Sequence, residues 1–64
     1  MRYRDVDRAL KAAGFVLVRT NGSHCFYANA KTGKRTVVPN HGTKDIALGT
    51  LKNIEKATGI TLLK

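Results

Sequence analysis

Residues 15–39 read FVLVRTNGSHCFYANAKTGKRTVVP, and this stretch decides the fold. Near its middle, Asn21-Gly22 is a strong short signal for a β-hairpin, because both central residues of a type I′ turn need a positive φ angle. The flanking residues, 15–19 and 24–28, are rich in aromatic and β-branched side chains, which favour strands. The sequence therefore predicts two antiparallel strands joined at Asn21-Gly22.

The chain is expected to turn a second time at residues 30–33, which read Ala-Lys-Thr-Gly. Residues 34–38 then predict a third strand, which Pro39 is expected to end because proline cannot donate a hydrogen bond to a neighbouring strand. The result is a sheet of three antiparallel strands.

A helix precedes this sheet. Apolar residues recur at helical spacing over residues 3–13, and Gly14 follows as the expected terminator. After the sheet, residues 40–48 have no clear period. We expect a loop there, held to the core by Ile46 and Leu48.

A second helix is expected to open at Gly49 or Thr50 and to end at Gly59, with Leu51 and Ile54 on its apolar face. Helix, three antiparallel strands and helix make an α+β fold, α-β-β-β-α, whose economical packing sets both helices on one face of the sheet. A chain of 64 residues has room for a single domain, residues 1–64. The order of elements is that of the double-stranded-RNA-binding module.

The charge is strongly unbalanced. Twelve Lys and Arg residues against four Asp and Glu residues give a formal net charge of +8, and the basic residues are spread along the whole chain. Self-repulsion of this size opposes compaction unless a polyanion or an acidic partner neutralises it. Nucleic acid is the leading candidate partner, ahead of an acidic protein and an anionic membrane surface.

Several classes of protein are excluded. A single cysteine, Cys25, rules out an internal disulfide and a cysteine-rich zinc module. No apolar run reaches the roughly 18 residues needed to span a bilayer, and the N-terminal residues lack the apolar stretch of a secretory signal. We therefore expect a soluble cytoplasmic protein without a cofactor or metal.

His24 is the candidate catalytic residue, because it begins a strand directly after a tight turn. Gly22 and Ser23 allow the backbone to approach a ligand and offer a hydroxyl group. An imidazole exchanges protons near neutral pH, so it can abstract the proton of an RNA 2′-hydroxyl and promote in-line attack on the adjacent phosphate. Cationic side chains must neutralise the developing charge, and the candidates for contacting RNA are Arg19, Lys34, Arg35 and Lys44.

Structural interpretations compete with these roles. Period-two alternation places His24 with Phe26 and Cys25 with Tyr27, but both pairs are partly apolar, so the buried face is left open. Cys25 is more typical of a buried strand cysteine than of a nucleophile. Phe26 and Tyr27 are able to stack on bases, but in a chain with four aromatic residues they are mostly needed for the core. His41 is typical of a loop histidine.

An ordered set of motifs resembles the HicA family of toxins across nearly the whole chain. These motifs are Ala13-Gly14-Phe15, Gly22-Ser23-His24, Val37-Val38-Pro39, His41, Lys44-Asp45-Ile46, Gly49-Thr50-Leu51, Ile54 and Gly59. The resemblance implies an mRNA interferase of a type II toxin–antitoxin system, with a double-stranded-RNA-binding-like fold and a HicB-type antitoxin as its partner. It maps the family's catalytic histidine onto His24, with Gly22 and Ser23 shaping the site. Many members carry a second histidine where this chain has Cys25.

Three hypotheses follow. The first is a metal-independent endoribonuclease, monomeric when free, that a protein partner inhibits. The second is a non-catalytic module that binds double-stranded RNA, and the third is an adaptor for an acidic protein. Cleavage of RNA separates the first from the second, and affinity for RNA separates the second from the third.

Overall fold

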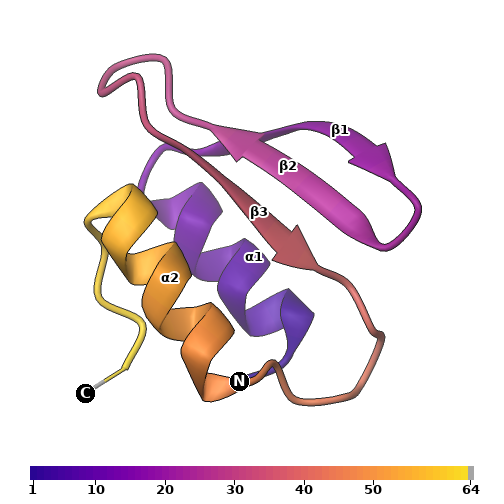
Figure 1. The fold of residues 1–64 in the computed structure, drawn as a ribbon. Coiled ribbons are helices and arrows are strands. Elements are labelled where there is room, and N and C mark those ends of the chain that lie inside the picture. Colours follow the sequence, from indigo (N-terminus) through magenta and orange to yellow (C-terminus); the bar gives the residue numbers. More distant parts are fainter. Residues whose placement is uncertain (64) are drawn as a thin grey trace.

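The computed structural model describes residues 1–63. Within this range the chain forms two helices and three strands: α1 (Tyr3–Ala12), β1 (Val16–Asn21), β2 (His24–Ala28), β3 (Arg35–Pro39) and α2 (Leu48–Thr58). The strands are antiparallel in the order β1-β2-β3, and both helices lie on the same side of the sheet (Figure 1). The α-β-β-β-α fold predicted from the sequence is confirmed. No helix in the described range is long and apolar enough to cross a membrane.

The turn between β1 and β2 differs from the prediction. Asn21 remains in β1 and pairs with His24, so the two residues of the loop are Gly22 and Ser23. Gly22 has a φ angle of 61°, whereas no residue other than glycine has a positive φ in residues 1–63. A positive φ at the first loop residue alone is the pattern of a type II′ turn, so the predicted type I′ turn at Asn21-Gly22 is wrong by one position.

The two faces of β2 are clearly distinguished. Cys25 and Tyr27 are buried beneath the helices, whereas His24 is exposed and Phe26 is half-buried on the opposite face. The structure therefore confirms that Cys25 is a buried strand cysteine. The prediction that Phe26 is mainly needed for the core is wrong, because it lies on the face that no helix covers.

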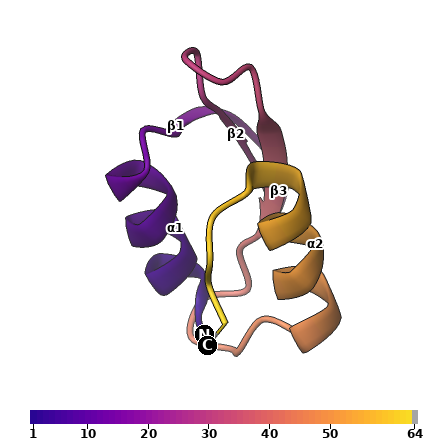
Figure 2. The same ribbon diagram turned by 90° about the vertical axis from the view of Figure 1, so that its left-hand side faces the viewer.

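The core joins both helices to the sheet. Its fully buried members include Val6 and Leu10 of α1, Val38 of β3 and Ile54 of α2. The segment after α2 runs between the two helices (Figure 2), and the Glu55 carboxylate accepts hydrogen bonds from the amides of residues 62 and 63 at 2.6 and 2.8 Å. By contrast, every residue of β1 is exposed. β1 is therefore an edge strand that lies outside the core.

The predicted loop over residues 40–48 is held by one of its two expected anchors. Ile46 is buried, and its amide donates to the carbonyl of Met1 at 2.7 Å. Leu48 instead begins α2 and is 57% exposed, so its predicted role in the core is wrong. At about 100° per residue, Leu48 lies roughly a quarter turn away from the face that carries Leu51 and Ile54.

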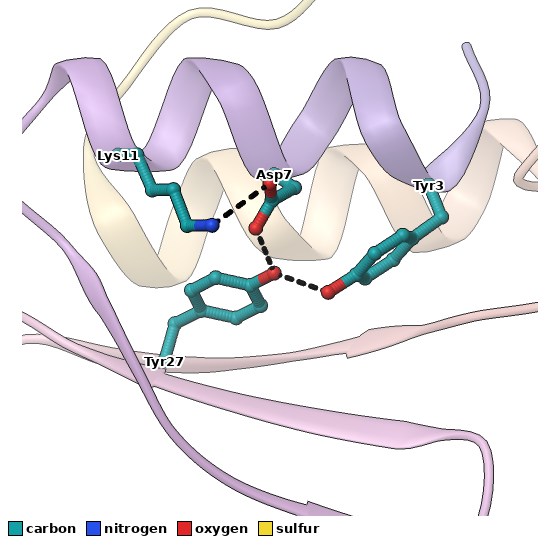
Figure 3. Close-up of polar contacts among 4 residues, drawn as sticks. All are labelled: Tyr3, Asp7, Lys11 and Tyr27. Atoms are coloured by element: carbon teal, nitrogen blue, oxygen red, sulfur yellow. Dashed lines mark hydrogen bonds and ion pairs between the residues drawn. The ribbon is translucent and has the colours of Figure 1, made fainter.

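A polar cluster ties α1 to β2 on the buried side of the sheet (Figure 3). The Tyr27 hydroxyl donates to Asp7, so the Tyr3 hydroxyl must donate to Tyr27. Lys11 forms an ion pair with the other Asp7 oxygen at 3.2 Å. Burial, followed by the hydrogen bond to Asp7, raises the pKa of Tyr27 well above its ordinary value. Tyr27 therefore acts as a protonated structural donor.

Candidate functional site

His24 stands at one end of the open face, which is the face of the sheet that the helices leave uncovered. It is the first residue of β2 and is paired on both sides, with Asn21 of β1 and Pro39 of β3. Its side chain is exposed to solvent. Because the backbone is held from two strands and by the tight turn, the imidazole is presented from a rigid support.

The Gly22-Ser23 turn is tied to the segment that follows β3. The amide of Asn40 donates to the carbonyl of Ser23 at 2.7 Å, which extends the pairing of the strands past His24. Beyond Asn40, the amide of Lys44 donates to the carbonyl of His41 at 3.3 Å. The exposed residues His41 and Lys44 therefore belong to the loop that continues from the His24 end of the sheet.

Gly22 has room for a side chain, since a Cβ atom built there would have no neighbour within 4 Å. The glycine is therefore required by its positive φ angle and not by crowding. This geometry fits a role for Gly22 and Ser23 in shaping the turn in front of His24.

Arg19 lies on the open face, diagonally across the strand pair from His24. It pairs with Phe26, two positions along β2 from His24, and its guanidinium lies 4.3 Å from the centroid of the Phe26 ring. Diagonal neighbours in an antiparallel sheet are about 7–8 Å apart, which a long side chain can span. Arg19 is thus the predicted cation that the fold brings nearest to His24 along the sheet.

The other predicted cations on β3 are more distant. Arg35 pairs with Ala28 and lies four positions from Pro39, about 13 Å along the strand. Lys34 points elsewhere: a Cβ built on Gly59 would lie 2.9 Å from its ammonium nitrogen. Lys34 therefore lies at the C-terminal end of α2, where the helix dipole favours a cation, and the structure does not bring it to His24.

The cations of the open face are not neutralised by carboxylates. In residues 1–63, the ion pairs join Lys11 to Asp7 and the N-terminal amine to Asp45, and neither involves Arg19 or Arg35. In the same part of the chain, no three His, Cys, Asp or Glu side chains gather closely enough to hold a metal ion. The open face thus combines an exposed imidazole with arginines that are available to an anion.

A hollow of about 290 Å³ lies on this face, two positions along β2 from His24 at its nearest lining residue on that face, Phe26. It is lined by Val18, Arg19, Phe26, Tyr27, Arg35, Thr36 and Val37. This hollow was not predicted from the sequence, because the residues of β2 leave open which side of the strand is buried. The signal that marks this face as exposed is the charge on Arg35. Through the pairing of β2 with β3, Arg35 shares this face with Ala28, Phe26 and His24.

Comparison with known proteins agrees with the fold and the motifs. Residues 3–60 match the family model described as HicA toxin of bacterial toxin-antitoxin. The chain is also 38% identical over 60 residues to a protein of Pseudomonas fluorescens (strain Pf0-1) named "Probable mRNA interferase HicA", a match that covers 94% of this chain and 97% of the relative. The chain therefore belongs to the HicA toxin family.

Proposed function

We propose that this protein is the toxin of a type II toxin–antitoxin system and that it cleaves mRNA with His24 as general acid and base. The observation that carries the proposal is the exposed imidazole at the start of β2, directly after a tight turn, with Arg19 diagonally across the strand pair and in no ion pair with a carboxylate in residues 1–63. The name of the Pseudomonas relative, a probable mRNA interferase, supports the same activity. One core joins both helices to the sheet, so we take residues 1–64 as a single toxin domain. We also propose that the free toxin is a monomer and acts in the cytoplasm.

The reaction uses the RNA's own 2′-hydroxyl as nucleophile. Neutral His24 accepts the proton of that hydroxyl, the 2′-oxygen forms a bond to the adjacent phosphorus, and the bond from phosphorus to the 5′-oxygen breaks. The products are a 2′,3′-cyclic phosphate and a 5′-hydroxyl whose proton comes from water or from the imidazolium. The oxygens of the phosphorane gain negative charge during the step, and the guanidinium of Arg19 is the nearest group along the sheet that can stabilise it. This step needs no metal or cofactor.

An antitoxin of the HicB type fits the exposed surface. A formal charge of +8 attracts a partner with acidic groups, which can occupy the positions of RNA phosphates. β1 also exposes apolar side chains, with Val16 57%, Leu17 42% and Val18 56% accessible. Such a patch is typical of a surface that another protein covers. Binding there would block the open face and stabilise a small fold by mass action.

Replacement of His24 by Ala tests the catalytic role. His24 is exposed, so the variant is expected to keep the melting temperature and the RNA affinity of the parent while losing cleavage of RNA in the presence of a chelator. General acid–base catalysis contributes about 10²–10⁴-fold, so the rate should fall at least a hundredfold. Cleavage by the variant at the parent's rate would refute the proposal.

The same assay separates the alternatives. A module that only binds RNA would show salt-sensitive affinity and no strand scission by the parent protein. An adaptor for an acidic protein would have no affinity for RNA even at low salt, where electrostatic attraction to phosphates is strongest.

A further inference from the structure

We propose that the hollow on the open face is a nucleobase subsite, which binds the base of a nucleotide next to the phosphate at which the 2′-hydroxyl activated by His24 attacks. This inference rests on the proposed function for its position on the substrate. The binding itself can be measured without cleavage.

The size of the hollow suits one base. Its volume of about 290 Å³ lies just below the range for drug-sized small-molecule sites, about 300–1,000 Å³. One nucleobase with part of its ribose is a ligand of that scale, whereas a base pair is larger. The hollow is therefore matched to a single unpaired nucleotide.

The lining has the chemistry of a stacking site. Phe26 supplies an aromatic ring that is half-buried and so held in place, and Val18 and Val37 supply exposed aliphatic walls. Single-stranded nucleic acids are bound in this way, with bases stacked on aromatic or arginine side chains. The guanidinium of Arg19 lies 4.3 Å from the Phe26 centroid and so stacks on the ring, and a base would stack on the outer side of this pair.

The charge of the hollow favours a nucleotide over an apolar ligand. Arg19 and Arg35 both line it, and in the described part of the chain neither forms an ion pair with a carboxylate. Each arginine can contact a phosphate of the strand whose base enters between them. Single-stranded RNA is an acidic polymer that also carries aromatic groups, so it matches this combination.

The position of the hollow connects it to the catalytic histidine. Phe26 lies two positions from His24 on the same face of β2, about 7 Å away. That separation is within the reach of one nucleotide. A base held on Phe26 therefore positions its own sugar and phosphate in front of the imidazole.

The first test uses a 2′-O-methyl RNA oligonucleotide, which has no free 2′-hydroxyl and is not cleaved. Phe26→Leu removes the ring and keeps an apolar side chain of similar length. Leu48→Ala is the control, since Leu48 is 57% exposed on α2 and lies outside the hollow. We expect Phe26→Leu to weaken binding of the oligonucleotide about tenfold, within the range measured for loss of one base–aromatic stack, and Leu48→Ala to leave it unchanged. Equal affinities of the two folded variants would overturn the proposal.

The second test shows which part of the nucleotide is bound. Adenosine 5′-monophosphate should shift the methyl NMR signals of Val18 and Val37 through the ring current of the base and leave those of Leu48 in place. Ribose 5-phosphate should not reproduce these shifts. Identical shifts with both compounds would mean that the site binds phosphate alone. Loss of antitoxin affinity without loss of oligonucleotide affinity in Phe26→Leu would assign the hollow to the protein partner. Either result refutes a base subsite, while cleavage by the His24→Ala variant bears only on the proposed function.

Discussion

Replacement of Tyr27 by Phe removes one oxygen atom from the polar cluster that joins α1 to β2. The Tyr27 hydroxyl donates to Asp7 and accepts from Tyr3, so the change breaks two hydrogen bonds and leaves the buried ring in place (Figure 3). The van der Waals packing of the ring is unchanged, and the loss of stability therefore reports the polar contacts.

The magnitude follows from the partners of the hydroxyl. A hydrogen bond to a charged group contributes about 1.5–3 kcal/mol, and a neutral one about 0.5–1.5 kcal/mol. Asp7 keeps its ion pair with Lys11 at 3.2 Å, and its side chain is 22% exposed, so water can replace part of what is lost. We therefore expect Tyr27→Phe to lower the free energy of unfolding by about 2 kcal/mol. For a domain of this size that corresponds to a fall in Tm of about 8–16 °C.

Thermal and urea denaturation of the free protein measure this change. Tyr3→Phe is the matched control, because it removes only the donor to Tyr27 and should cost about 1 kcal/mol. Both variants should keep the RNA affinity of the parent, since the hydroxyl groups that they remove contact α1, on the opposite side of the sheet from His24. A Tm for Tyr27→Phe within about 2–3 °C of the parent, which is about a quarter of the expected shift, would contradict this account of the cluster. A Tm no lower than that of Tyr3→Phe would contradict it too.

The cluster also predicts the behaviour of the fold at high pH. The pKa of Tyr27 is raised in the folded protein, whereas in the unfolded chain a tyrosine ionises near about pH 10. The contribution of Tyr27 to the free energy of unfolding is therefore fully present below about pH 10. It is lost as the pH rises toward the folded pKa, because the tyrosine of the unfolded chain releases its proton first. The difference in stability between the parent and Tyr27→Phe should narrow above about pH 10.

Three further predictions concern other parts of the molecule. Gly22→Ala places a side chain at a φ of 61° and should cost about 1–2 kcal/mol, with a loss of cleavage beyond the loss of RNA affinity because His24 is displaced; unchanged urea unfolding would contradict this. Hydrogen bonds from the amides of residues 63 and 62 lower the pKa of Glu55 in the folded protein. Its contribution to the free energy of unfolding is therefore present above about pH 4.3 and is lost as the pH falls through the folded pKa. Unfolding curves from pH 2 to 7 should show that Glu55→Gln loses less stability than the parent on acidification. Arg19→Ala should reduce the slope of log K for RNA binding against log salt concentration by about 0.7. Lys34→Ala should leave the slope unchanged, because Lys34 lies at the end of α2. Equal slopes for the two variants would count against the open face as the RNA surface.

Much of the fold is readable from local patterns. The order of elements, the hairpin between β1 and β2 and the ends of both helices follow from short-range signals, because a glycine or an apolar period acts on the residues next to it. The burial of Ile46 was also predicted, from its apolar side chain in a polar loop, although the same reasoning failed for Leu48.

Register and packing decided the rest. A shift of one residue in the turn moved the loop from Asn21-Gly22 to Gly22-Ser23, a choice made by the pairing of Asn21 with His24 across the sheet. The ammonium group of Lys34 lies at the end of α2 and not over the strands, a position that the residues next to Lys34 in sequence do not reveal. Asn29, buried between the second turn and the end of α1, donates to the carbonyl of Ala13 at 3.2 Å, and this link also needs the folded chain.

The sequence by itself determined that His24 and Phe26 share one face of a strand, because side chains alternate with a period of two along any strand. The residues of β2 alone could not determine which face is buried, since Cys25 and Tyr27 form an equally apolar pair. Only the pairing with β3, which places the charged Arg35 opposite Ala28, marks the exposed face. The tertiary structure decided this by packing Val6, Leu10 and Ile54 of the two helices against the side that carries Cys25 and Tyr27. A side chain's neighbours across a sheet and beneath a helix are distant in sequence, and their packing alone turned the imidazole, the ring of Phe26 and Arg19 toward solvent as one surface.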